Sequence, residues 1–409
     1  MIVLKHVRLI DGTGSECQED VSVMVGDGKI KKIGRGLEVP AGCIVVDGTG
    51  KTVIPGLIDA HTHFSGSSLF TRPGMDNANA SRDFAEGREG CLRWGVTTVR
   101  TCGDMEEDIL GYVKARRDGT ALRGPNVVAC GPMFQANNGH PYFTIMPGNT
   151  EALEKAIVLA DIVDDLEGEI DRILDNGASF VKCVYGHVNR TDRGNSVPRL
   201  GEDILARIVA HTHKRGKKVC CHVDTVEEMV AAAEMGIDSI EHCTNVGSTN
   251  PPLTEEMIEA VKKSGAVLDP TNVALGPWEA LLHIENGTCA YNLDLTKRMY
   301  DAGVPLAIGC DSGIPLIPFG EAVHEEMALF VKAGIDPLAV LKIATHDNAV
   351  LLGVDDRAGT IEEGKNADLV LVDGNPLADI ADTKNIRLVI QDGDIVSGSV
   401  LPGSGRVFG

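Results

Sequence analysis

Two patterns of apolar and polar positions alternate along the chain from residue 56 onward. Short apolar runs rich in Val, Ile and Cys are typical of buried strands, and longer stretches between them place apolar residues at helical spacing. The runs that predict strands are residues 57–61, 96–102, 126–131, 180–185, 218–222, 239–242, 266–269 and 305–311. Eight parallel strands that alternate with helices predict an α/β fold of the (β/α)8, or TIM barrel, type, with the active site where the strands end.

Helical spacing is clearest in residues 225–236 and 254–265, each of which opens on a Thr suited to an N-cap and closes on a Gly. An open doubly wound sheet is the alternative fold for alternating strands and helices. No Gly-rich phosphate-binding fingerprint follows any of the predicted strands, which favours the barrel.

The two ends of the chain carry a different pattern. Residues 1–50 and 367–400 contain alternating apolar and polar runs with hairpin signals such as Gly-Asp-Gly and Gln-Asp-Gly-Asp. Neither end has enough strands for a fold of its own, so we expect the two to pair into one small β-sandwich. The predicted domains are this composite sandwich, residues 1–55 with 355–409, and the barrel, residues 56–354.

Composition and charge limit the partners. A formal net charge of −21 over 409 residues disfavours a phosphate-binding surface, so nucleic acid is not an expected partner. The first residues alternate too early for a signal peptide, and no run approaches a membrane span, which predicts a cytoplasmic protein without membrane contact. Most of the eleven cysteines fit small buried strand residues better than a disulfide framework. Barrels of this kind often assemble, and a homo-oligomer is expected.

The tripeptide His-Thr-His occurs twice, and its context separates the two copies. His61 and His63 follow an apolar strand, where residues two apart point the same way. His211 and His213 lie in a segment of helical spacing, where residues two apart diverge, so we assign them no ligand role.

Further candidate ligands stand at the ends of other predicted strands. They are Lys182 on strand 4, His222 on strand 5, His242 on strand 6 and Asp311 on strand 8. Together with His61 and His63 these side chains converge on one rim of the barrel. Imidazole and carboxylate groups suit a divalent transition metal, zinc being the common choice for hydrolysis.

The chain resembles the metal-dependent amidohydrolase superfamily, in its imidazolonepropionase-like and prolidase-like branch. The resemblance is carried by Pro-Gly-Leu-Ile-Asp-Ala-His-Thr-His at 55–63, by His222, Glu241-His242 and Asp311-Ser312, and by Gly-Thr-Ile-Glu-Glu-Gly-Lys-Asn-Ala-Asp at 359–368. It implies that His61, His63 and Asp311 hold one metal ion, and that His222 and His242 hold a second. It also implies that Lys182 is carbamylated and bridges the two ions. Alternation in strand 4 leaves open whether Lys182 faces the barrel interior or extends outward into solvent.

The resemblance further implies the hydrolysis of a peptide or amide bond. Two metal ions can activate a shared water as a bridging hydroxide, and Asp311 is the candidate to accept its proton and deliver it to the leaving nitrogen. An Xaa-Pro dipeptide is the expected substrate. His140, Tyr185 and Arg190 are the candidates to bind its free carboxylate, or that of a related N-acyl amino acid.

Other functions stay open. A carboxypeptidase that releases Lys or Arg would need an acidic pocket base, and residues 271–278 after strand 7 offer only apolar and amide groups, which favours a compact apolar residue such as proline. A carboxypeptidase for another apolar residue, a cyclic amide hydrolase, or an inactive barrel used as a binding scaffold are the alternatives.

Overall fold

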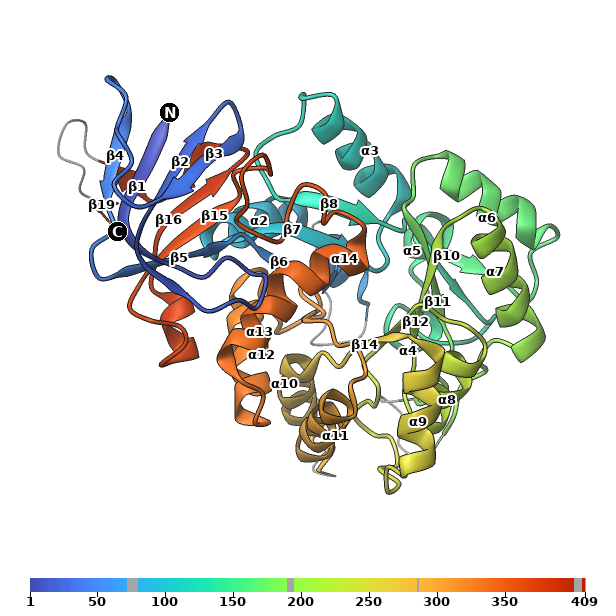
Figure 1. Ribbon diagram of the computed structural model, residues 1–409. Coiled ribbons are helices and arrows are strands. Elements are labelled where there is room, and N and C mark those ends of the chain that lie inside the picture. Colours follow the sequence, from blue (N-terminus) through green and yellow to red (C-terminus); the bar gives the residue numbers. More distant parts are fainter. Residues whose placement is uncertain (72–79, 190–194, 285–286, 401–406, 409) are drawn as a thin grey trace.

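The two ends of the chain form one sheet beside the barrel. The computed structural model describes residues 1–71, 80–189, 195–284, 287–400 and 407–408 (Figure 1). The sheet has the order β17-β16-β15-β5-β1-β2-β3, with β4 paired to β1. Its strands are β1 (Ile2–Leu9), β2 (Gln18–Gly26), β3 (Lys29–Gly34), β4 (Ile44–Asp47), β5 (Lys51–Pro55), β15 (Leu369–Asp373), β16 (Ile386–Gln391) and β17 (Asp394–Ser397).

Strand β5 joins the N-terminal and C-terminal segments of this sheet. It pairs in parallel with β1 and antiparallel with β15, so that Val53 lies opposite both Leu9 and Leu371. Alternate residues from both ends of the chain, such as Leu4, Val23 and Leu371, meet in one apolar cluster. The predicted β-sandwich built from the two chain ends is therefore confirmed.

Gly56 alone separates the terminal sheet from the first barrel strand. A Cβ at this position would lie 2.1 Å from Thr97 Oγ1, so only glycine fits where the two parts meet. The backbone N–H of Gly56 donates to Asp368 O at 2.8 Å, which ties the passage to the C-terminal segment.

Parallel strands form the predicted TIM-like barrel. They are β6 (Leu57–Thr62), β7 (Val96–Thr101), β8 (Asn126–Ala129), β9 (Met133–Gln135), β11 (Phe180–Val184), β12 (Lys218–His222), β13 (Ser239–Glu241) and β14 (Val267–Asp269). The third barrel strand consists of two pieces, because β8 pairs with β7 while β9 pairs with β11. Gly131, at φ +74°, lies in the break between them. A short extra strand, β10 (Ile157–Leu159), pairs with β9.

The eighth predicted strand, residues 305–311, is an extended segment without a continuous ladder. It closes the barrel through isolated bridges, Leu268 to Leu306 on one side and Thr62 to Ser312 on the other. The reason is that side chains bind the N–H groups that a ladder would use. Gly309 N donates to Asp269 Oδ1 at 2.9 Å, and Cys310 N donates to Asp59 Oδ1 at 3.1 Å.

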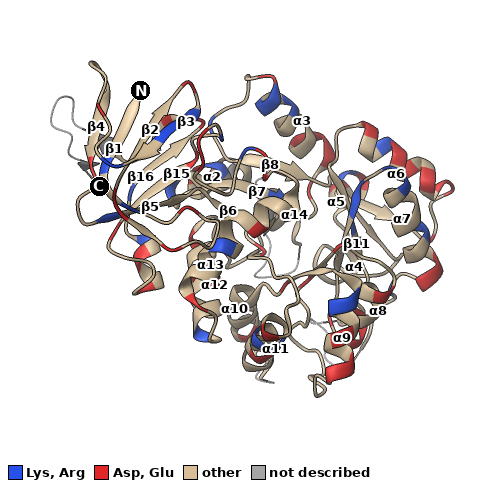
Figure 2. Ribbon diagram, in the orientation of Figure 1, with Lys and Arg blue, Asp and Glu red and all other residues tan. Residues whose placement is uncertain are grey.

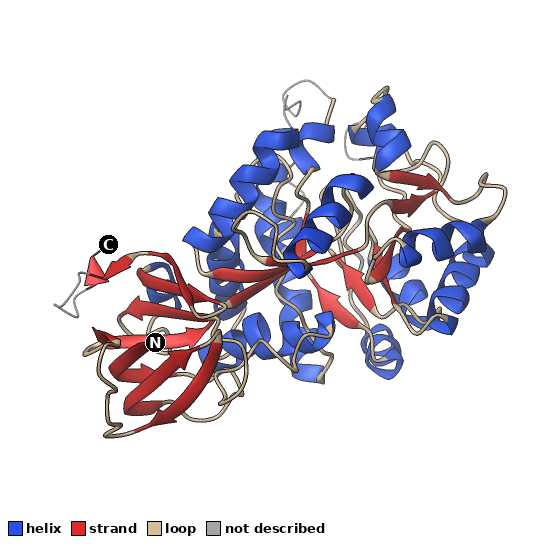
Figure 3. Ribbon diagram, turned by 90° about the horizontal axis from the view of Figure 1, so that it is seen from above, coloured by secondary structure: helices blue, strands red, loops and turns tan. Residues whose placement is uncertain are grey.

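Helices cover the outside of the barrel strands, and the terminal sheet stands to one side of them (Figure 3). The longer ones are α2 (Ala80–Arg93), α3 (Glu106–Arg117), α6 (Leu166–Asp175), α7 (Glu202–Lys214), α8 (Val226–Glu234), α9 (Glu255–Ser264), α10 (Asn272–Leu282), α11 (Thr288–Ala302) and α12 (Glu321–Lys332).

The two helices predicted most clearly, α8 and α9, begin where their caps predict. Thr225 and Glu228 form a capping box, and Thr254 Oγ1 accepts from Met257 N. Residues 271–278, expected as a loop, instead begin helix α10 after Thr271 in the left-handed region.

Acidic side chains are spread over the outer helices α6, α7 and α9 (Figure 2). Among the described residues, no helix combines the length and the apolar character needed to cross a membrane. All eleven cysteines are free thiols and eight of them are buried, but only Cys183, Cys220 and Cys221 lie within strands.

Candidate metal centre

Three side chains meet at the carboxyl end of β6. His61 and His63 point the same way, and their Nε2 atoms are 3.3 Å apart. Asp311 Oδ1 lies 3.1 Å from His63 Nε2 and 3.5 Å from His61 Nε2. Two imidazole nitrogens and a carboxylate oxygen this close together form a donor set that suits one divalent metal ion.

Two more imidazoles extend this cluster from the ends of β12 and β13. The ring centroids of His222 and His242 are 4.5 Å apart, and those of His61 and His242 are 5.0 Å apart. His242 and Asp311 both adopt the left-handed region, with φ of +77° and +60°. Residues other than glycine seldom adopt this region, and those that do cluster at functional sites.

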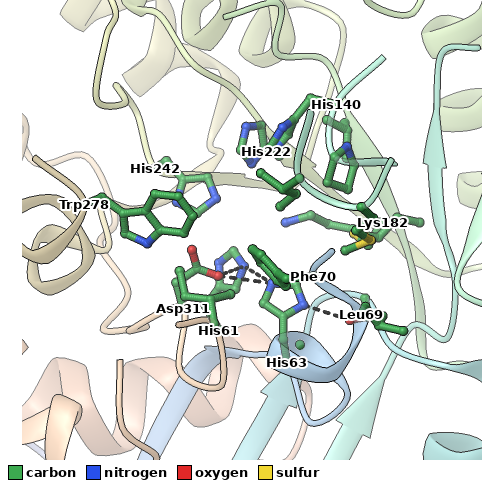
Figure 4. Close-up of a pocket in the computed structure, with 18 residues that line it drawn as sticks. His61, His63, Leu69, Phe70, His140, Lys182, His222, His242, Trp278 and Asp311 are labelled. Carbon is green, nitrogen blue, oxygen red and sulfur yellow. Dashed lines mark hydrogen bonds and ion pairs between the residues drawn. The ribbon is translucent and has the colours of Figure 1, made fainter. Parts of the chain in front are cut away.

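Lys182 of β11 points into the same space (Figure 4). It lines the pocket with Val184, whereas Val181 and Cys183 pack in the main apolar core. Lys182 is 2% exposed, which excludes the solvent-facing alternative. No described residue forms a hydrogen bond with its buried Nζ.

Each histidine of the cluster has one ring nitrogen held by a neighbouring group. The pairs are His61 Nδ1 with Glu241 Oε2 at 2.7 Å, His63 Nδ1 with Gly103 O at 2.7 Å, His242 Nδ1 with Thr271 Oγ1 at 2.8 Å, and His222 Nε2 with Asp224 Oδ1 at 3.0 Å. Such contacts fix the ring orientation, which is the usual arrangement around metal-binding histidines. The residues present therefore fit a metal centre.

Glu241, which the family resemblance named only as part of a motif, and Arg100, which no sequence pattern indicated, are important neighbours of the cluster. Glu241 Oε1 accepts from Arg100 Nη2 at 2.8 Å, while its Oε2 contacts His61. Burial raises the pKa of the Glu241 carboxyl, but Arg100 and His61 together hold it well below its usual range. Strand alternation would separate Glu241 from His242. The left-handed turn at His242 instead brings both toward the barrel interior.

The sequence profile of the amidohydrolase family matches residues 52–396, which include the whole barrel and most of the C-terminal strands. The chain belongs to the amidohydrolase family. It is 25% identical to an ochratoxinase from Aspergillus niger over 412 aligned positions, which cover 91% of this chain and 81% of that protein.

Two solved structures show how closely the fold of this amidohydrolase is shared. A Xaa-Pro dipeptidase with bound methionine in its active site superposes with a TM-score of 0.79 at 24% identity, covering 97% of this chain and all of the other. A prolidase complexed with N-methylphosphonate-L-proline gives a TM-score of 0.77 at 24% identity, with 97% of this chain and 99% of the other covered. At this identity the two likenesses concern the fold.

The protonation states of His61, His242 and Asp311 suit metal binding, whereas burial of His63 is outweighed by its contact with Asp311, which raises the pKa of His63 above its usual value. Burial lowers the pKa of His61 to about 4 and that of His242 well below its usual value. Burial raises the pKa of Asp311, but its contacts with His63 and the other imidazoles hold it well below the usual range. Neutral imidazoles and an ionised carboxylate are the forms that bind a metal.

The cluster lies at the base of a pocket of about 560 Å³, measured with its open mouth (Figure 4). His140 lies there as predicted, its ring centroid 4.9 Å from that of His222. Apart from the cluster and His140, the described side chains that line the pocket are apolar. They are Leu69, Phe70, Met133, Pro141, Ile145, Met146, Val184, Trp278 and Ile314.

The other predicted residues lie elsewhere. Tyr185 is on the helix-facing side of its strand, outside the described pocket lining, and its hydroxyl contacts Glu202 at 3.3 Å. Strand alternation explains this, because Tyr185 is an odd number of residues from Lys182. Arg190 is outside the described residues. His211 and His213 lie on α7 and pair with Asp171 and Asp238, away from the cluster.

Proposed function

We propose that this amidohydrolase uses two divalent metal ions, most simply zinc, to hydrolyse the peptide bond of an Xaa-Pro dipeptide. The observation that carries the proposal is the convergence of four oriented imidazoles and Asp311 around a buried lysine that has no hydrogen-bond partner among the described residues. A structural role would leave the lysine paired, since buried polar groups are almost always hydrogen-bonded.

The donor set divides between two ions. His61 Nε2, His63 Nε2 and Asp311 would hold the first. His222 and His242 would hold the second, with their rings oriented by Asp224 and Thr271. Every ligand that the family resemblance requires is thus supplied by a buried or nearly buried side chain.

Lys182 would bridge the two ions as a carbamate. Burial opposes its ammonium form, but the nearby Cys220, Cys102 and Glu241 raise the pKa of Lys182 above its usual value. Two dications beside an ammonium would repel it strongly. Attack of the neutral Nζ on CO2 forms an N–C bond and releases a proton, which turns this cation into a carboxylate ligand.

When bound, the metal ions would supply an activated water and polarise the scissile carbonyl. The protein's own part is to position and move protons. Asp311, ionised and held beside His63, would accept the proton of the attacking water. It would then deliver that proton to the leaving nitrogen of proline. The apolar side chains of the pocket wall would limit the access of bulk water to this transfer.

The pocket chemistry favours a compact apolar leaving residue. His140 would bind the free carboxylate of the substrate next to His222. Asp311 is the one carboxylate among the described lining residues, and it belongs to the metal cluster, so a Lys or Arg side chain would have no counter-charge. A Xaa-Pro dipeptidase and a prolidase are among the proteins of similar fold, which supports the same substrate.

The test is hydrolysis of a dipeptide panel by zinc-loaded protein. Xaa-Pro, Xaa-Leu, Xaa-Lys and Xaa-Arg are compared by kcat/KM, with zinc counted per chain by elemental analysis. We expect two zinc ions and a preference for Xaa-Pro. Two zinc ions without any dipeptide cleavage would reject the substrate but retain the metal chemistry, and cyclic amides would be tested next because dihydroorotases are also among the similar proteins.

A further inference from the structure

Trp278 lies in the wall of the active-site pocket. It belongs to α10, on the loop side of the seventh strand, and is 4% exposed. Figure 4 shows its indole at the edge of the pocket, next to His242 and Asp311. The ring centroid of Phe70 is 6.4 Å away at a tilt of 45°, so the two aromatic rings form one wall.

The indole Nε1–H of Trp278 is buried and has no hydrogen-bond acceptor among the described residues. Among the described residues, several buried side-chain polar atoms have no hydrogen-bond partner, and only Trp278 Nε1 and Lys182 Nζ of these line the pocket. The metal bridge proposed above accounts for Lys182. It does not account for Trp278, because an indole N–H can only donate and cannot bind a metal.

A buried donor left without a partner is costly, and native proteins rarely keep one. The cost is recovered when a ligand brings an acceptor, and a site built this way rejects ligands that lack it. The position beside Asp311 is where the reacting part of a substrate must come, given the proposed function on which this inference rests.

We propose that Trp278 is a specificity-determining residue whose Nε1–H donates a hydrogen bond to an oxygen of the bound amide substrate. The faces of Trp278 and Phe70 hold the apolar group next to that oxygen. The preferred substrate class is therefore an amide with an apolar side chain and an acceptor oxygen within reach of the indole. A substrate with a basic group there would leave the indole N–H unpaired.

The chain has only two tryptophans, which makes the hydrogen bond directly observable. In protein labelled with ¹⁵N-tryptophan, the two indole N–H resonances are assigned with the Trp94→Phe variant. Trp94 contacts His324 and is absent from the described pocket lining, so it serves as the internal control. The zinc-loaded enzyme is titrated with N-methylphosphonate-L-proline and, separately, with L-proline.

We expect the phosphonate to move the Trp278 indole proton downfield and to leave that of Trp94 in place. Trp278→Phe should weaken phosphonate inhibition by about 10- to 100-fold, the effect of losing a hydrogen bond to a charged acceptor, while Trp94→Phe should not. If L-proline alone causes the shift, the acceptor is the carboxylate. If only the phosphonate does, the acceptor is an oxygen at the reacting centre, and both results support the proposal.

A second replacement guards against misfolding of Trp278→Phe. In the Trp94→Phe background, biosynthetic replacement of the remaining tryptophan by benzothienylalanine exchanges N–H for sulfur and preserves the shape. The role of Trp278 would be overturned if the phosphonate inhibits the wild type tightly without an indole shift and inhibits the Trp278→Phe and benzothienylalanine proteins equally well. The proposed function would then remain intact. No inhibition of the wild type would refute the Xaa-Pro chemistry, and the inference would fall with it.

Discussion

Replacing Glu241 by Gln tests whether the contacts behind the metal cluster hold it together. The Glu241 carboxylate is engaged at both oxygens. His61 contacts Oε2, and Oε1 accepts from Arg100, the Ser239 hydroxyl and the Cys220 thiol. A glutamine offers a single acceptor oxygen and turns an NH2 group toward the remaining donor. One donor is then opposed by another donor, and among the described residues Asp269, 3.7 Å away, is the acidic group that remains beside the buried Arg100.

The expected cost follows from this geometry. Removing one partner of a buried ion pair typically destabilises a protein by about 3–5 kcal/mol, because the remaining charge stays desolvated. Loosening the orientation of His61 should also lower zinc affinity by about 10- to 100-fold, the usual effect of losing such a contact. Urea unfolding of the metal-free protein measures the first quantity, and zinc titration against a competing chelator measures the second.

Glu326→Gln is the matched control for this variant. Glu326 is equally buried but accepts from the N–H groups of Asn272 and Val273 and faces no guanidinium. It should leave zinc affinity unchanged. If Glu241→Gln unfolds at the same urea concentration as the wild type and binds zinc equally well, the reasoning about the contact between Glu241 and His61 is wrong.

Three further predictions follow from other residues. Lys182→Ala should reduce the zinc content from two ions per chain to one or none, and acetate should partly restore activity. Lys218→Ala is the control and should retain both ions, because Lys218 Nζ contacts Leu351 O outside the cluster. Retention of two ions by Lys182→Ala would reject the bridge. Asp311→Asn should lower kcat by at least about 10²-fold in protein that still holds its metals, and near-normal turnover would remove Asp311 as the proton carrier. Burial raises the pKa of Glu326 from 4.5 to about 7, so the folded protein retains a proton that the unfolded chain releases, and this carboxyl should lower the stability by about 3 kcal/mol between pH 4.5 and 7. The loss of stability over this range should be smaller by that amount in Glu326→Gln, and an equal pH dependence in the two proteins would show that the carboxyl is not responsible.

Most of the metal cluster could be predicted from the sequence because each member ends an apolar run. His61, His222 and His242 stand where hydrophobic strands give way to polar loops, and parallel strands bring such positions to one rim. The side of strand β11 from which Lys182 projects could not be predicted. Both faces of β11 are apolar, since one packs on helices and the other fills the barrel.

The positions of the remaining site residues depend on local backbone turns, which the spacing of apolar residues does not predict. Glu241 and His242 both reach the cluster, although adjacent strand residues alternate, because of the left-handed turn at His242. Trp278 reaches the pocket because residues expected as a loop begin helix α10 after the left-handed Thr271. The eighth strand lacks a ladder because buried aspartates bind its N–H groups, a contact between positions far apart in the sequence.

A two-metal centre bridged by a modified lysine is tested most directly by a crystal structure of zinc-loaded protein with anomalous data at the zinc edge. We expect two anomalous peaks, one among His61, His63 and Asp311 and the other beside His222 and His242, with added density on Lys182 Nζ. A single peak at the first position, with Lys182 unmodified, would contradict this expectation.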